Sequence, residues 1–129
     1  MDELTRVAIR RWIEKAERDL ITARTMLALD PPVTDVVCFH CHQCAEKAFK
    51  AFLVRSSVHI EKTHYLRRLL ILCMELEPSF SALEDPATNL SDYVATRYPD
   101  DWREIPGDEA SRAMQDAIRI LEFVRGRLD

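Results

Sequence analysis

Residues 35–55, DVVCFHCHQCAEKAFKAFLVR, predict one uninterrupted helix that organises the rest of the chain. The stretch has no Pro or Gly and lies between Pro31-Pro32 and Ser56-Ser57, which are helix-ending signals. Residues three and four apart share a helix face. The apolar side comprises Val37, Cys38, Cys41, Cys44, Ala45, Ala48, Phe49 and Phe52. The polar side comprises His40, His42, Gln43, Glu46, Lys47 and Lys50. Imidazole, amide and ammonium groups gathered on one side are typical of a functional face.

Two further stretches, one before and one after this helix, have apolar residues at helical spacing. Residues 3–29 place apolar side chains at helical intervals between charged ones, and residues 30–32, Asp-Pro-Pro, end that pattern. Residues 63–77 predict another helix with Thr63 as its N-cap. This helix is apolar nearly all round, which is typical of the most buried helix in a bundle.

The C-terminal part predicts an irregular segment and a final helix. Short helical turns are expected at 80–84 and 86–96, and Asp108 is expected to cap a helix over 108–128. No strand pattern, internal repeat or composition break is present. The sequence therefore predicts an all-α fold, an up-and-down bundle of four to five helices with an irregular segment before the last one. Residues 1–129 are expected to form a single domain.

Composition limits the functional classes. The chain has two glycines, so neither a P-loop nor a GxGxxG motif can be written. The formal net charge of -4 argues against a dedicated nucleic-acid binder, although a local basic patch is compatible with it. No N-terminal signal-like segment or bilayer-length apolar run is present, so we expect a cytoplasmic protein without a membrane partner.

Cysteines are the first candidates for chemistry. The four are Cys38, Cys41, Cys44 and Cys73. Disulfides are not expected in a reducing compartment. Cys38 and Cys41 lie one helical turn apart, and Cys73 with His59 or His64 could in principle complete a zinc site. The helix-borne cysteines lie on the apolar face, however, and free Cys is among the most buried residue types. We expect packing residues and no metal ligands.

The segment 97–102, RYPDDW, is the second candidate. It combines a guanidinium, two aromatic rings and two carboxylates in a stretch that breaks the helical pattern. Such surface segments are typical of sites that recognise planar or anionic ligands. A packed corner, in which Tyr98 and Trp102 close the bundle and Arg97 pairs with Asp100, explains the same residues. Both interpretations stay open.

The polar side of 35–55 is the third candidate. One interpretation is a solvated face with i,i+4 pairing. The other is a ligand site, formed if the Arg97 segment folds back against this helix. The residues concerned are His40, Gln43, Lys47 and Lys50, together with Glu46. A lone histidine such as His64 is usually a structural hydrogen-bonder. No nucleophilic triad is indicated, and Asp100 and Asp101 need not converge on a general acid–base pair.

Residues 42–53, HQCAEKAFKAFL, resemble the signature helix of HEPN domains. The likeness extends over about residues 12–124. It includes the opening WIEKAERDLITA, a short THYLRRLL helix, and the motif Arg97-Tyr98-Pro99-Asp100 ahead of the last helix. The resemblance implies a compact helical bundle that forms a homodimer and is often encoded beside a minimal nucleotidyltransferase.

Many HEPN proteins are ribonucleases, frequently toxins, with an Arg followed four to six residues later by a His at a site assembled across the dimer. This chain departs from that pattern, because Asp101, Trp102 and Arg103 follow Arg97 at those positions and no histidine occurs after His64. Cleavage through the 2′-hydroxyl needs a proton acceptor of near-neutral pKa beside a cation. The Arg97 segment offers only carboxylates and a phenol beside its cation, which argues against ribonuclease activity.

The resemblance therefore implies a non-catalytic, nucleotide-binding and partner-binding HEPN module of the nucleotidyltransferase-associated branch, in a toxin–antitoxin-like system. Arg97 would contact phosphate, Tyr98 or Trp102 would stack on a base, and Lys47 or Lys50 would assist. The expected nucleotide-binding residues are His42, Gln43, Lys47, Lys50, His64, Arg97, Tyr98, Asp100 and Trp102. No catalytic residue and no required cofactor are expected, and RNA is the weaker candidate ligand.

Two alternatives stay open. The first is a divergent, metal-independent HEPN endoribonuclease toxin that uses His42 or His64 together with Arg97. The second is a dimeric scaffold that only docks an enzyme partner.

Overall fold

The computed structural model describes residues 1–56, 62–94 and 99–128. Its elements are α1 (Glu3–Leu27), α2 (Thr34–Arg55), α3 (Leu66–Leu76), the 3₁₀ helix η1 (Pro78–Leu83), α4 (Glu84–Leu90), the 3₁₀ turn η3 (Pro99–Asp101) and α5 (Gly107–Arg125). Those residues contain no strand. The all-α helical bundle is confirmed, with the short elements η1, α4 and η3 ahead of the last helix.

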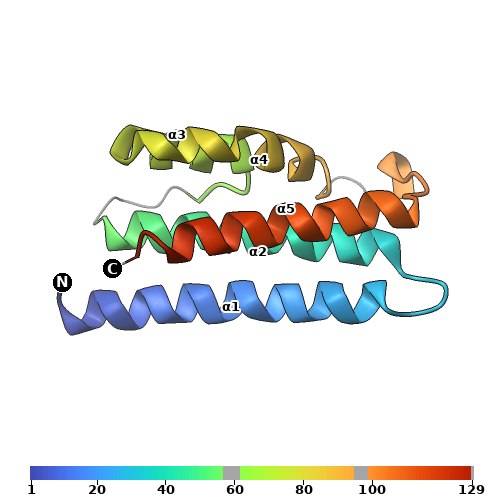
Figure 1. Ribbon diagram of the computed structural model, residues 1–129, viewed down its shortest axis with the longest axis horizontal. Helices are drawn as coiled ribbons and strands as arrows, with labels where there is room; N and C mark the ends of the chain where they lie inside the picture. The colour runs from blue at the N-terminus through green and yellow to red at the C-terminus, as the bar shows by residue number, and fades with distance from the viewer. Residues whose placement is uncertain (57–61, 95–98, 129) are drawn as a thin grey trace.

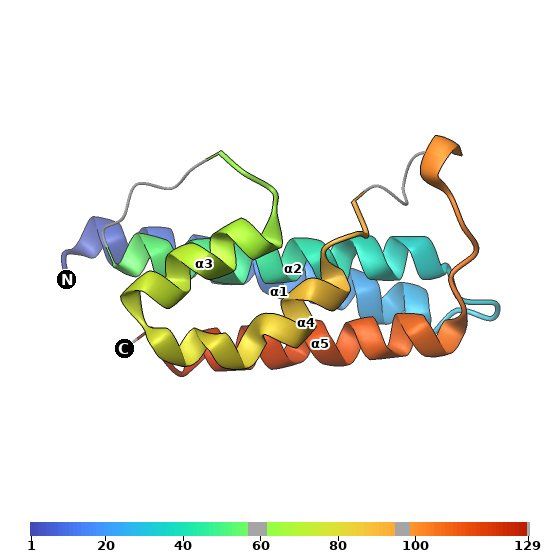
Figure 2. The same cartoon turned by 90° about the horizontal axis from the view of Figure 1, so that it is seen from above.

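Helix α2 lies at the centre of the bundle, with α1 on one side and α3 and α4 on the other, while α5 runs beside it (Figures 1 and 2). α1 is antiparallel to α2, whereas α3 and α5 point in the same direction as α2. Within the described residues no helix is both long and apolar enough to cross a membrane. Because α2 contacts helices on several sides, some of its polar residues are buried as well.

Two predicted helix caps are wrong. α3 begins at Leu66 after Tyr65, and the Thr63 hydroxyl instead accepts a hydrogen bond from the Tyr65 N–H at 3.2 Å. α5 begins at Gly107 after Pro106, which cannot donate an N–H and suits a helix start. Asp108 is consequently inside the first turn, where its negative charge still favours the helix N-terminus.

The prediction that the 63–77 helix is the most buried is also wrong. On α3 the side chains of Ile71 and Leu76 are 48% and 45% exposed. α2 is the more buried helix, because its central position covers both its apolar side and part of its polar side. Because α3 lies on the outside of the bundle, it buries only one face. Some of its apolar side chains therefore stay exposed to solvent.

The core joins α2 to the C-terminal half through aromatic side chains. The ring of Phe80 lies 4.5 Å from that of Phe52 and 5.0 Å from that of Phe123, measured between centroids. Such tilted and edge-on contacts add to the burial of the rings themselves. η1, which carries Phe80, therefore connects α2 to the C-terminal part of α5.

Candidate functional site

The polar side of α2 is largely buried, so the solvated-face interpretation is wrong for its central residues. His42, Glu46 and Lys50 are only 1%, 3% and 7% exposed. They lie four residues apart, in line along the helix. Charged groups are almost never buried without a partner. Each of these three side chains has one.

Glu46 connects α2 to the chain just ahead of α3. Both of its carboxylate oxygens lie close to Nδ1 of His64, at 3.1 and 3.2 Å. Nζ of Lys50 donates to Oε2 of Glu46 at 3.0 Å and lies 5.6 Å from the ring centroid of Trp12 on α1. The His64 side chain is 74% exposed although the carboxylate that holds it is 4% exposed. A buried carboxylate thus orients an imidazole that faces solvent.

His42 holds the same segment from one turn earlier on α2. Its Nδ1 lies 3.1 Å from Oε1 of Gln43, and its ring has a hydrogen bond with the backbone of His64. Burial lowers the pKa of His42, which favours the neutral ring. We call His42, Gln43, Glu46, Lys50 and His64 the histidine cradle. Four of its members are among the nucleotide-binding residues predicted from the sequence.

A second ion cluster ties α1 to α2. Asp19 accepts Nζ of Lys47 at 2.5 Å through one oxygen and lies 2.8 Å from Nδ1 of His40 through the other. Asp19 is 7% exposed, so the pair is largely shielded from water. The ammonium of Lys47 is therefore already paired with a carboxylate of the protein, that of Asp19.

The cysteines are packing residues, as predicted. All four are buried. Burial raises the pKa of Cys38, Cys44 and Cys73 to about 12 and that of Cys41 further still. The thiols therefore stay protonated and unreactive in the folded protein. Among the described residues, no group of three or more His, Cys, Asp or Glu side chains is placed to hold a metal ion.

The predicted Arg97 segment is only partly within the described residues. Arg97 and Tyr98 lie outside them. Asp100 belongs to η3 and is exposed, and Trp102 is 58% exposed. The packed-corner interpretation is therefore wrong for Trp102, whose ring is open to solvent. A large exposed ring fits a ligand or partner contact.

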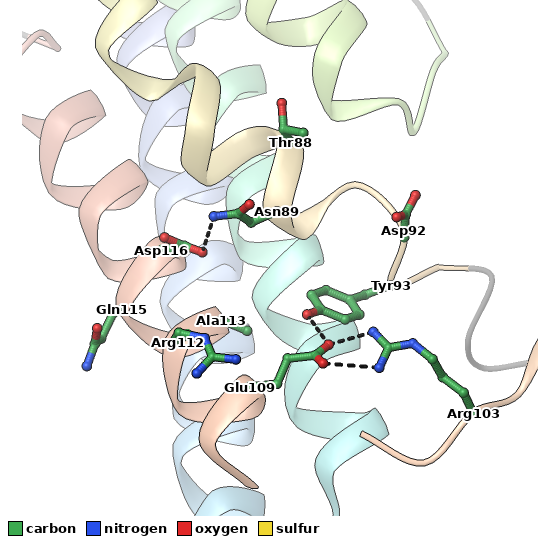
Figure 3. A pocket seen from close by; sticks show the side chains of 10 residues that line it. All are labelled: Thr88, Asn89, Asp92, Tyr93, Arg103, Glu109, Arg112, Ala113, Gln115 and Asp116. Atoms are coloured by element: carbon green, nitrogen blue, oxygen red, sulfur yellow. Dashed lines mark hydrogen bonds and ion pairs between the residues drawn. The ribbon is translucent and has the colours of Figure 1, made fainter. Parts of the chain in front are cut away.

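A cleft of about 550 Å³ lies between the end of α4 and the first half of α5 (Figure 3). Its lining is Thr88, Asn89, Asp92, Tyr93, Arg103, Glu109, Arg112, Ala113, Gln115 and Asp116. We call it the α4–α5 cleft. Its volume is typical of small-molecule sites, and its lining is more polar than theirs. None of its residues was predicted from the sequence.

Three groups converge at one end of the cleft (Figure 3). Arg103 donates to both oxygens of Glu109, at 3.1 and 2.6 Å, and the Tyr93 hydroxyl donates to the same carboxylate at 2.7 Å. The Arg103 guanidinium lowers the pKa of Glu109. Burial raises the pKa of Tyr93, and the hydrogen bond to Glu109 raises it further. The carboxylate thus stays ionised and the phenol neutral.

The other end of the cleft carries hydrogen-bonding groups, with a cation between the two ends (Figure 3). Nδ2 of Asn89 donates to Oδ2 of Asp116 at 3.3 Å. Burial raises the pKa of Asp116, while the Arg112 guanidinium acts in the opposite direction. Among the described residues, the ion pair of Arg112 is with the exposed carboxylate of Asp108, at 3.2 Å. Its side chain is 64% exposed, so it can turn toward a ligand at little cost.

A sequence signal for this cleft exists but is weak. Glu109, Arg112 and Asp116 follow each other at i, i+3 and i+7, beside the apolar stripe of α5. Polar residues at this spacing usually form a solvated face, and only the placement of α4 shows that they line a cleft. The partner residues Asn89 and Tyr93 come from a segment with no such periodicity.

Comparisons with known proteins identify the family. The family model described as "HEPN domain" matches residues 9–127. The chain is similar to "Putative toxin MJ1304" of Methanocaldococcus jannaschii, with 28% identity over 88% of this chain and 84% of that protein. It is also similar to the crystal structure of ST0689, an archaeal HEPN homologue, with 30% identity and a TM-score of 0.75 over 94% of this chain and 98% of that one. The chain therefore belongs to the HEPN domain family.

Proposed function

We propose that this HEPN protein is a toxin-like module that binds a nucleotide in the α4–α5 cleft and has no catalytic activity of its own. One observation carries the proposal: one cleft of about 550 Å³ holds the exposed cation Arg112 beside the hydrogen-bonding pair Asn89 and Asp116. Phosphate needs a cation, and a base needs directional donors and acceptors. The cleft offers both.

The proposal places phosphate on the arginines and not on the lysines of α2. The ammonium groups of Lys47 and Lys50 are bound by Asp19 and Glu46, so a phosphate would have to displace a carboxylate from either one. Arg112 has no such obstacle, because an exposed i,i+4 pair is weak. The segment with Arg97, Tyr98 and Trp102 leads directly into Arg103 of the cleft, and we propose that it adds a phosphate contact and a stacking ring.

Calorimetric titration of the purified chain with nucleotides tests this site. We expect Arg112→Ala to weaken binding by about tenfold or more, which is the effect of losing one charged hydrogen bond. Arg10→Ala is the matched control, because Arg10 is equally exposed and also has a weak helical partner, Glu3. Unchanged binding by the Arg112 variant, or no binding by the wild-type chain, would refute the proposed site.

We also propose that the protein forms a homodimer and acts with a minimal nucleotidyltransferase partner. Support comes from its membership of the HEPN family and from its likeness to a protein named as a toxin. Light scattering after gel filtration would measure the mass in solution, and co-expression with a nucleotidyltransferase encoded beside it would test the pair. A monomer that does not co-purify with such a protein would contradict this part of the proposal.

A divergent, metal-independent endoribonuclease is the second candidate, and the histidine cradle favours it. An ionised carboxylate can only accept, so the Nδ1–H of His64 donates to Glu46 and leaves Nε2 as an exposed proton acceptor. Such a base could take the proton of a 2′-hydroxyl as that oxygen attacks the adjacent phosphorus, while the bond to the 5′-oxygen breaks and this oxygen takes a proton from water. The Arg97 segment would supply the cation for the phosphate.

RNA degradation in the presence of EDTA separates the two candidates. If the cradle is catalytic, His64→Ala should abolish cleavage, whereas His40→Ala should retain it because His40 belongs to the Asp19 cluster. Cleavage that persists in the His64 variant would exclude His64 as the base. A wild-type chain without any cleavage would leave the non-catalytic module.

A further inference from the structure

We infer that the α4–α5 cleft recognises guanine, with Asp116 and Asn89 accepting the hydrogens of N1 and of the 2-amino group. The inference rests on the proposed function, because it names the base of the nucleotide at the same site. It follows from the hydrogen-bonding groups at the end of the cleft away from Arg103 (Figure 3).

The hydrogen bond between the two side chains fixes what they can offer a ligand. Asn89 donates Nδ2–H to Oδ2 of Asp116 at 3.3 Å. An ionised carboxylate has no hydrogen to donate and retains several acceptor sites. The amide oxygen of Asn89 is a further acceptor. Among the described residues, Asn89 is the one hydrogen-bond donor to this carboxylate. This end of the cleft is therefore rich in acceptors.

Of the four RNA bases, guanine fits such a surface best. Its Watson–Crick edge carries two neighbouring donors, N1–H and the 2-amino group. Adenine, cytosine and uracil have no two neighbouring donors on that edge, so two adjacent acceptors of the protein would face at least one lone pair in each of them. An unpaired polar group in a binding site is penalised strongly, which makes this kind of mismatch selective.

The surroundings of Asp116 support the assignment. Burial is the main cause that raises the pKa of this carboxyl, so the group is already partly withdrawn from water before a ligand arrives. The guanidinium groups of Arg112 and Arg119 act on the same carboxylate in the opposite direction. Arg112 lies between Asp116 and Glu109 in Figure 3.

Calorimetry of the full chain with GMP, IMP, AMP and XMP tests the inference. We expect GMP to bind tightest, and IMP, which lacks the 2-amino group, to bind about tenfold more weakly. AMP should bind more weakly than IMP, because it presents an acceptor at N1. Equal affinity for GMP and AMP would overturn the guanine inference and leave the nucleotide proposal standing. Binding of none of the four would overturn both.

A specificity switch provides the sharper test. Asp116→Asn replaces one acceptor with a donor, so it should lose about tenfold in GMP affinity and bind XMP, which has an oxygen in place of the 2-amino group, more tightly than GMP. Asp85→Asn is the matched control, because the Asp85 charge also acts on Asp116 but its side chain does not line the cleft. That control should keep the preference for GMP. The same ranking of GMP and XMP in the Asp116 variant and the wild-type chain would overturn the inference.

Discussion

The histidine cradle and the α4–α5 cleft use similar residues in opposite ways. In the cradle, the side chains of Glu46 and Lys50 are 4% and 9% exposed and bind each other. Arg112 of the cleft pairs with Asp108 beside it at a similar N–O distance, and these side chains are 64% and 74% exposed. Both pairs are four residues apart on one helix. Burial, and not sequence spacing, is what separates them.

The difference in burial decides what each region can do. Charges taken out of water interact strongly, and neither partner can leave without exposing the other to an apolar environment. The cradle therefore positions His64 and resists change. Exposed charges interact weakly and are screened by salt. The arginine at the cleft can exchange its partner for a ligand, which is a requirement for a binding site.

The largest expected effect is the loss of Glu46. Glu46→Ala leaves the buried ammonium of Lys50 without a carboxylate and frees His64, so we expect it to lower the free energy of unfolding by about 3–5 kcal/mol. Urea denaturation followed by circular dichroism would measure this change. A loss below about 1 kcal/mol would contradict the strong coupling that burial implies.

A double variant separates the burial penalty from the geometry. Glu46→Leu combined with Lys50→Met removes both charges and retains apolar volume, and such replacements are often neutral for stability. We expect the double variant to recover most of the stability lost by Glu46→Ala. If the double variant is as unstable as the single one, the loss of stability is caused by the missing contact between Glu46 and His64.

The second effect belongs to the cleft. Tyr93→Phe removes a hydroxyl that donates to Glu109 at 2.7 Å, and we expect a loss of about 1.5 kcal/mol in the free energy of unfolding. The loss is smaller than at Glu46 because Arg103 still binds the carboxylate. Thermal unfolding monitored by calorimetry would measure it. A loss as large as that of Glu46→Ala would show that the cleft is a rigid network too.

The helices were predictable because their signals are local. Apolar spacing and the Pro31-Pro32 stop locate α1 and α2 to within two residues of their observed ends. The relative burial of the helices was not predictable in this way. α3 is the more apolar in sequence yet lies at the surface, whereas α2 is buried because other helices surround it. Burial depends on where a helix lies in the bundle, and the spacing of apolar residues within one helix does not show this.

The two candidate sites also differ in how far local sequence patterns predict them. His42, Glu46 and Lys50 are predicted on one polar side of the helix by their spacing alone. Their pairing with His64 depends on how the chain returns to α2, which no local pattern encodes. The cleft is harder still, because Tyr93 and Glu109 meet only after α4 and α5 pack. Local periodicity predicts which residues share a helix face. A site formed between distant segments can be located only from the tertiary structure.

The third effect is a dependence of stability on pH that arises in the cradle. Burial lowers the pKa of His42 below its ordinary value of 6.5, so the unfolded chain binds protons there more readily than the folded one. Its contribution to stability is therefore complete above pH 6.5 and decreases as the pH falls below that value. Urea midpoints at pH 7.5 and 5.5 should show this loss, and His42→Gln should reduce it. An equal slope in the variant would assign the dependence to another group.

The smallest expected effect on stability is at Arg112. Arg112→Ala breaks only an exposed pair with Asp108, so the free energy of unfolding should change by no more than about 0.5 kcal/mol. Chemical denaturation at low and high salt would measure it, and a loss above about 1 kcal/mol would show that the arginine has a structural role in the cleft. A near-zero change makes this variant a clean probe, because weaker nucleotide binding could not then be attributed to unfolding. The Glu46 variant does not have this advantage, since any loss of function in it is mixed with loss of fold.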